Sequence, residues 1–247
     1  MYFIIFDLEF NQDFSSLQSF DWSKSKYPFE IIQIGAIKLD SAFNTIATFN
    51  RYVKPTLYTK INPFITELTG ITTEQLLTEE PFPAIYKAYT DFIGGIDSVF
   101  CIWGMSDIKE LFKNAAYHEL SSKLLPRMFI NLQPYVSMHL NLSPKNLLRL
   151  QHAVIALTIP ITYPFHNALY DAYYTAEIFK KIYNPFIQPG LYDPLYVAPT
   201  QRQRKREIDS DMLLQQFEKM YARKMTEEEQ KIIVLAYKMG RTKQFLK

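Results

Sequence analysis

The chain begins with MYFIIFDLEF (residues 1–10), an apolar run interrupted only by two acidic residues. The run predicts a buried strand that ends at the polar residues 11–13. Residues two apart on a strand point to the same face, so Asp7 and Glu9 project side by side and Leu8 points to the opposite face. Adjacent carboxylates repel each other and are costly to desolvate, and a hard cation relieves both costs. The pair therefore indicates a metal site, with a solvent-exposed strand end as the alternative.

The composition places limits on the class of protein. The 247 residues, of which 48% are hydrophobic, fit one globular domain with an appendage. The net charge is only +2, but residues 1–200 carry 15 Lys/Arg against 18 Asp/Glu, whereas residues 201–247 carry 12 against 7. A single cysteine, Cys101, excludes an intrachain disulfide. With no basic residue before the apolar start and no apolar run of about 18 residues, we expect a cytoplasmic protein without a membrane span.

Alternating and apolar stretches predict five strands, and helical periodicity predicts the segments between them. The strands are expected over residues 1–10, 30–40, 45–53, 97–103 and 127–132. Helices are expected from Asn62-Pro63 to Gly70, after Thr72 and Pro81, over 106–117, from Pro144 and over 167–183. A meander followed by helix-separated strands predicts an α/β fold with a mixed five-stranded sheet flanked by helices.

The C-terminal part of the chain differs from the rest. We expect a main domain over 1–185, a Pro-rich to basic linker over 186–206 and a small helical tail over 207–247. Thr226 and Glu229 have the spacing of a capping box at the start of the second tail helix. The linker ends in a basic run, which is either a phosphate-binding stripe or a solvated linker. Its members are Arg202, Arg204, Lys205 and Arg206.

Two later segments add candidate polar groups. Asp107 follows the strand over 97–103 and begins a helix, where capping is the alternative role. His166 lies at the start of the helix over 167–183, and Asp171 lies just inside it. Histidine has a reference pKa of about 6.5 and can act as a base at neutral pH. The alternative is a capping histidine and a surface aspartate.

The order of these signals resembles that of the DEDDh exonucleases, the DnaQ-like branch of the ribonuclease-H-like superfamily. The order is Asp-x-Glu on a strand, an Asp after a later strand, and His followed by Asp five residues on. Within this group the sequence is similar to KapD-like proteins and to the 3′ exoribonucleases that trim histone mRNA ends. The resemblance covers about residues 1–185 and rests on residues 6–10 (FDLEF), 30–36 (EIIQIGA), 67–72 (ELTGIT) and 166–172 (HNALYDA).

The resemblance assigns roles to individual residues. It implies two divalent cations, Mg²⁺ or Mn²⁺, and a general base, His166. The acidic metal-site residues would be Asp7, Glu9, Asp107 and Asp171. The residues against the terminal nucleotide would be Leu8, Phe10, Leu68, Thr69 and His166.

The implied reaction is hydrolysis from the 3′ end. The resemblance predicts a metal-dependent 3′–5′ exonuclease that converts single-stranded nucleic acid, with RNA favoured, to nucleoside 5′-monophosphates. Its partners would be RNA or DNA 3′ ends. A DNA-specific proofreading or repair exonuclease is one alternative, and a non-catalytic binding module on the same fold is the other. The sequence leaves the oligomeric state and the biological target open.

Overall fold

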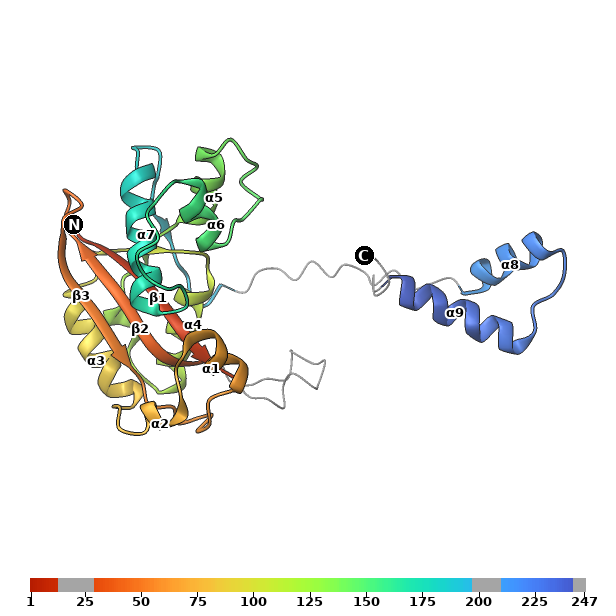
Figure 1. Cartoon of the computed structure of the whole chain (residues 1–247), viewed down its shortest axis with the longest axis horizontal. Coiled ribbons are helices and arrows are strands. Elements are labelled where there is room, and N and C mark those ends of the chain that lie inside the picture. Colours follow the sequence, from red (N-terminus) through yellow and green to blue (C-terminus); the bar gives the residue numbers. More distant parts are fainter. Residues whose placement is uncertain (13–28, 197–209, 242–247) are drawn as a thin grey trace. The chain divides into compact units, whose positions relative to one another are not determined.

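The computed structural model describes residues 1–12, 29–196 and 210–241, and the chain divides into two compact units (Figure 1). The first unit is Met1–Leu195 and the second is Tyr196–Lys247. The basic run at 202–206 lies outside the described residues. In the described part of the chain, no helix is long and apolar enough to cross a membrane.

A mixed sheet forms the centre of the first unit. Its strands, in spatial order, are β3 (Thr45–Tyr52), β2 (Glu30–Leu39), β1 (Phe3–Asn11), β4 (Val99–Ile102), β5 (Met128–Asn131) and β6 (Gly190–Leu191). The first three strands in the chain form an antiparallel meander, β1, β4 and β5 are parallel, and β6 is antiparallel to β5. The predicted α/β class with a mixed sheet is confirmed.

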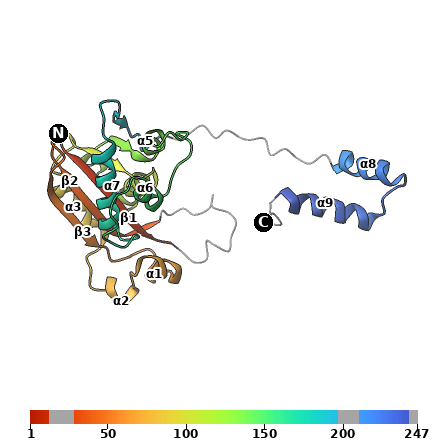
Figure 2. The ribbon, with the colours of Figure 1, turned by 45° about the horizontal axis from the view of Figure 1, so that its top comes forward.

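Helices cover both faces of this sheet (Figure 1). One face carries α7 (Ala168–Ile182) together with α5 (Leu132–His139) and α6 (Leu150–Ala156), which lie beside it (Figure 2). The other face carries α3 (Phe82–Ile93) and α4 (Ser106–Tyr117). The short helices α1 (Pro63–Thr69) and α2 (Thr73–Leu76) follow β3, and a 3₁₀ turn, Ser122–Leu124, follows α4.

Strand alternation divides the apolar side chains of β1 between the two cores. Phe3 and Ile5 pack on the side of α7, whereas Ile4, Phe6 and Leu8 pack on the side of α3 and α4. By the same alternation, Asp7 and Glu9 lie on the side of α7.

The predicted helix ends after β3 are confirmed by their capping. The Asn62 side chain accepts a hydrogen bond from the backbone N–H of Phe64 at 2.9 Å, and Pro63 occupies the first helical position. Gly70 ends α1 with φ of 74°, a left-handed conformation in which glycine has no Cβ penalty.

Two of the sequence predictions for the first unit are wrong. The sheet has six strands in the described part of the chain rather than five, because β6 pairs with β5 over only two residues, too few for a periodic pattern. No helix begins at Pro144, since residues 140–149 are irregular and α6 begins at Leu150. Side chains of the unpredicted helix α5 hold that loop: Ser137 donates to the carbonyl of Asn146 at 2.6 Å, and Gln133 donates to that of Leu148 at 3.1 Å.

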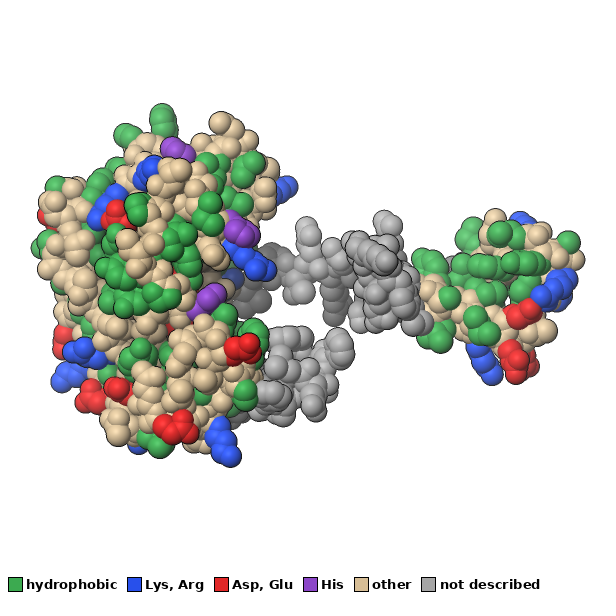
Figure 3. Space-filling view, in the orientation of Figure 1, with side chains coloured by type: hydrophobic (Ala, Val, Ile, Leu, Met, Phe, Trp, Pro, Cys, Tyr) green, Lys and Arg blue, Asp and Glu red, His purple; other side chains and the backbone are tan. Residues whose placement is uncertain are grey.

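The second unit contains a helical hairpin of α8 (Ser210–Tyr221) and α9 (Glu227–Arg241). The predicted capping box is present, with Thr226 N–H donating to the Glu229 carboxylate at 2.9 Å and Glu229 N–H donating to the Thr226 hydroxyl at 3.3 Å. Helix α9 continues past Gly240, where we predicted its end. Hydrophobic side chains are exposed on this hairpin (Figure 3).

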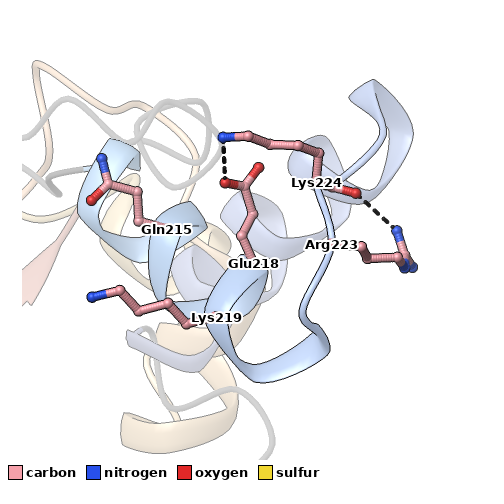
Figure 4. Close-up of a pocket in the computed structure, with 5 residues that line it drawn as sticks. All are labelled: Gln215, Glu218, Lys219, Arg223 and Lys224. Atoms are coloured by element: carbon pink, nitrogen blue, oxygen red, sulfur yellow. Dashed lines mark hydrogen bonds and ion pairs between the residues drawn. The ribbon is translucent and has the colours of Figure 1, made fainter.

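The hairpin also has a pocket of about 370 Å³ (Figure 4). Its lining consists of Gln215, Glu218, Lys219, Arg223 and Lys224. Two of the basic side chains form ion pairs within the hairpin: Lys224 with Glu218 at 2.9 Å, and Arg223 with Glu229. Most of the charged side chains that line the pocket therefore take part in ion pairs within the hairpin.

The start of α7 lies directly on β2, at a position that only glycine can occupy. A Cβ on Gly35 would lie 2.1 Å from the backbone of Ala168 and Leu169. Beside it, the buried Gln33 side chain accepts a hydrogen bond from Ala168 N–H at 3.2 Å and donates one to the Asn50 side chain at 2.9 Å. Gly35 and Gln33 are the partners of Asp7 and Glu9 across the β1–β2 pair.

Gly35→Ala tests this contact. Because the new methyl group meets backbone rather than a movable side chain, we expect the free energy of unfolding to fall by about 3 kcal/mol. Gly190→Ala is the control, since its Cβ meets only the Phe129 ring at 3.4 Å, and should change stability by less than about 0.5 kcal/mol. Urea denaturation followed by circular dichroism gives both values, and equal midpoints for the two variants would contradict the prediction.

Candidate active site

Three of the predicted acidic residues meet where β1 ends. Asp7 and Glu9 come from β1, and Asp171 comes from the first turn of α7. One carboxylate oxygen from each residue lies within 4.8 Å of the other two. Glu9 and Asp171 are buried and Asp7 is partly buried. The close approach of α7 to Gly35 produces this convergence, because it places the start of the helix over the middle of the meander.

The fourth predicted residue, Asp107, is buried near this group but outside it. It is the second residue of α4, directly after β4. The N-cap of α4 is Met105, which has no side-chain hydrogen bond, and the Asp107 carboxylate accepts a hydrogen bond from its own backbone N–H in the first turn. Its charge also acts on Asp7 and Glu9, whose pKa values it raises.

The four carboxyls are held in an environment that disfavours their charged forms. Burial, with further repulsion from Asp107, Asp171 and Glu9, raises the pKa of Asp7 well above its ordinary value. Burial, followed by repulsion from Asp171 and Asp107, raises the pKa of Glu9 to about 8. Burial raises the pKa of Asp107 to about 8 and that of Asp171 to about 6, the latter opposed by a hydrogen bond from the backbone of His166.

The donor set fits a divalent cation. The Oδ2 atom of Asp171 accepts the His166 backbone N–H at 3.1 Å, but its Oδ1 atom is buried without a hydrogen-bond partner. Within residues 1–12, 29–196 and 210–241, no lysine or arginine forms an ion pair with these carboxylates. Clustered carboxylate oxygens without a protein cation are the ligands that Mg²⁺ and Mn²⁺ prefer. The cluster formed by Asp7, Glu9 and Asp171 can therefore hold a divalent metal ion.

His166 lies at the start of α7, as its sequence position indicates. It is exposed and has φ of 66°, an uncommon conformation for a residue with a side chain. Its backbone, not its imidazole, contacts Asp171. The next residue, Asn167, caps α7 by accepting the Leu169 N–H at 3.2 Å.

The residues predicted to contact a nucleotide differ in exposure: Leu68 is exposed, Phe10 is partly buried and Leu8 is buried in the core. Leu68 is 40% exposed at the end of α1, and the Thr69 hydroxyl is bonded within the same helix, donating to the Ile65 carbonyl at 2.8 Å. Phe10 is partly buried and packs against Phe29. Leu8 lies in the core on the side of α3 and α4, 3% exposed, so its side chain is directed away from the carboxylates.

Sequence reasoning missed a residue that supports α1. The buried Glu30 carboxylate accepts hydrogen bonds from the backbone N–H groups of Thr56, Leu57 and Tyr58, which hold the loop between β3 and α1. Asn11 holds the same loop by donating to the carbonyls of residues 58 and 60, both at 3.0 Å. An acidic residue at the start of an otherwise apolar strand was the only signal of this role.

The mixed α/β sheet and the acidic cluster at its edge are consistent with a nuclease. A family model described as exonuclease (RNase T) matches residues 4–179. The chain therefore belongs to this exonuclease family. A comparison with curated proteins gave no match.

Solved structures of 3′-exonucleases share the fold. The nuclease domain of 3′hExo, a DEDDh family member bound to rAMP, is 20% identical with a TM-score of 0.65, covering 78% of this chain and 96% of that one. A 3′-exonuclease described with the 3′ end of a histone mRNA stem-loop is 20% identical with a TM-score of 0.60, and the match covers 72% of this chain but only 61% of that chain. E. coli Exonuclease I with an oligonucleotide is 18% identical with a TM-score of 0.52, and the match covers 73% of this chain and 40% of that chain.

Metal binding should stabilise the protein in a pH-dependent way. Without metal, the folded chain retains protons on Glu9 and Asp107 up to a pH of about 8, whereas the unfolded chain ionises near pH 4. The unfolded chain then holds fewer protons in this window, so the free energy of unfolding falls as the pH rises through it. Mg²⁺ binds the ionised carboxylates and should raise Tm more at pH 8 than at pH 5.

Thermal melts with EDTA or Mg²⁺ at the two pH values measure this difference. Asp171→Asn should reduce the Mg²⁺ effect, whereas Asp91→Asn, on the exposed surface of α3, should leave it unchanged. An equal Mg²⁺ effect at both pH values, or in wild type and Asp171→Asn, would exclude binding at this cluster.

Proposed function

We propose that the chain is a metal-dependent 3′–5′ exonuclease that releases nucleoside 5′-monophosphates from single-stranded nucleic acid, with RNA as the favoured substrate. The observation that carries this proposal is the convergence of Asp7, Glu9 and Asp171 within 4.8 Å, directly beside the backbone of His166. Membership of the exonuclease family supports the reaction class.

The acidic residues would hold two divalent ions. Asp7, Glu9 and Asp171 would be the principal ligands, and Asp107, buried near them, would add its negative charge to the site. Bound divalent ions lower the pKa of an attacking water and stabilise the leaving 3′ oxygen. Without such ions, the raised pKa values would leave the carboxyls partly protonated at neutral pH.

His166 would accept the proton of the attacking water at an imidazole nitrogen. Its exposure supports this role, because an exposed imidazole is accessible to both water and substrate. Its backbone is fixed to Asp171, so the side chain starts from a defined point next to the acidic group.

The terminal nucleotide would lie between α1 and the end of β1. Leu68, exposed at the end of α1, is suited to contact with a base, and Phe10 follows the acidic pair on β1. Since the Leu8 side chain is in the core, its contribution would come from the backbone. The preference for RNA follows from the sequence resemblance to 3′ exoribonucleases, and the exonucleases described with histone mRNA or rAMP are among the solved structures that share the fold.

The direct test uses matched single-stranded RNA and DNA with 5′ labels, incubated with Mn²⁺ or EDTA. We expect a ladder that shortens from the 3′ end, faster on RNA, and none with EDTA. Asp7→Asn should remove the ladder in Mn²⁺ while keeping the wild-type circular dichroism spectrum. A ladder on DNA alone would favour the DNA-specific alternative, and binding without nucleotide release would favour the non-catalytic module.

His166→Ala should lower turnover by about 100-fold or more, as expected for loss of a general base. Because its backbone rather than its imidazole contacts Asp171, the variant should bind Mn²⁺ as wild type does. Steady-state rates on the labelled RNA measure the first effect and Mn²⁺ titration measures the second. His152→Ala, an exposed histidine on α6, is the matched control. Wild-type turnover in His166→Ala would remove His166 from the role of base.

A further inference from the structure

The hydroxyl of Tyr174 holds the loop that leads to His166. Tyr174 lies on α7 and is fully buried. Its hydroxyl oxygen accepts the backbone N–H of Thr162 at 3.0 Å and that of Tyr163 at 2.7 Å, and it donates to the Tyr163 carbonyl at 2.7 Å. One hydroxyl thereby uses its single donor and two acceptor sites on the backbone of one loop.

Aromatic contacts reinforce the same attachment. The ring of Phe165, the residue before His166, stacks on Tyr174 with a centroid distance of 4.8 Å. The ring of Tyr163 stacks on Tyr170 at 4.6 Å with an interplanar angle of 9°. Tyr170 and Tyr174 are one helical turn apart, so one side of α7 holds both the backbone and the rings of the loop.

The other end of the loop is also fixed to α7. His166 N–H donates to Asp171, and Asn167 caps the helix. Between the two attachments, His166 has the left-handed φ of 66°, a conformation that persists only when the surrounding structure enforces it. Tyr174 supplies the attachment on the N-terminal side.

We propose that Tyr174 is a positioning residue for His166: its hydroxyl fixes residues 162–163 and thereby sets where the imidazole lies relative to the acidic cluster. The inference rests on the proposed role of His166 as base. Tyr174 would act through the loop, because all the hydrogen bonds found for its hydroxyl among the described residues are to the backbone of Thr162 and Tyr163. Its removal should therefore affect the chemical step and leave metal binding unchanged.

Tyr174→Phe removes the hydroxyl and keeps the ring that packs on Phe165. We expect kcat on single-stranded RNA to fall by about tenfold with KM nearly unchanged, because a displacement of about 1 Å at a catalytic group can cost up to about 100-fold. Tyr173→Phe is the matched control, since it removes a hydroxyl from the adjacent residue of α7, for which no hydrogen bond is found among the described residues. It should retain wild-type kcat.

A double-mutant cycle separates positioning from general support of the fold. If Tyr174 acts through His166, Tyr174→Phe should lower kcat in the wild type but produce no further loss in His166→Ala. An equal fold-loss in both backgrounds would overturn the positioning role and leave the base assignment intact. Full turnover in His166→Ala would overturn the base assignment, and with it the positioning role.

Hydrogen exchange provides a readout that does not depend on activity. In metal-free protein, the amides of Thr162 and Tyr163 should exchange at least about tenfold faster in Tyr174→Phe than in wild type, because each loses its acceptor. The amide of His166 should also exchange faster if the two ends of the loop are coupled. Unchanged exchange at Thr162 and Tyr163 would show that the hydroxyl does not hold the loop and would overturn the proposal.

Discussion

The close approach of α7 to β2 at Gly35 is the contact on which the acidic site depends. The helix backbone occupies the volume that a side chain at Gly35 would need, and Gln33 fixes the first helical N–H beside it. These two residues face Asp7 and Glu9 across the β1–β2 pair, so the helix is set down next to the acidic strand. Asp171, in its first turn, consequently meets carboxylates that lie more than 160 positions away in the sequence.

This arrangement places like charges together in a buried region, and the rest of the fold must offset that cost. Burial is the largest cause of the raised pKa values of all four carboxyls. Among the described residues, no lysine or arginine forms an ion pair with them that would oppose this effect. The apolar clusters on both faces of the sheet provide the compensating stability. A site that is unfavourable when empty is suited to bind cations strongly, since a divalent ion removes both the repulsion and the unmet solvation of the carboxylates.

Features that depend on local chemistry were predictable from the sequence, and those that depend on distant partners were not. Asn62 and Gly70 form the two ends of α1, and Thr226 caps α9, because capping involves residues two to four apart. The irregular loop over 140–149 was missed because its backbone is held by side chains of α5. The role of Glu30 was missed for the same reason, since the amides that it binds follow β3.

The spacing between His166 and Asp171 has a physical explanation in the helix start. With Asn167 as the N-cap, Asp171 is the fourth residue of α7, and its side chain reaches back to the N–H of His166. One carboxylate therefore uses Oδ2 to hold the loop, while its buried Oδ1 has no hydrogen-bond partner. A shift of one residue in either direction would rotate the carboxylate by about 100° around the helix and lose this hydrogen bond. The loop, the helix start and the acidic strand therefore meet at Asp171, whose carboxylate holds the backbone of the candidate base and also belongs to the candidate metal site.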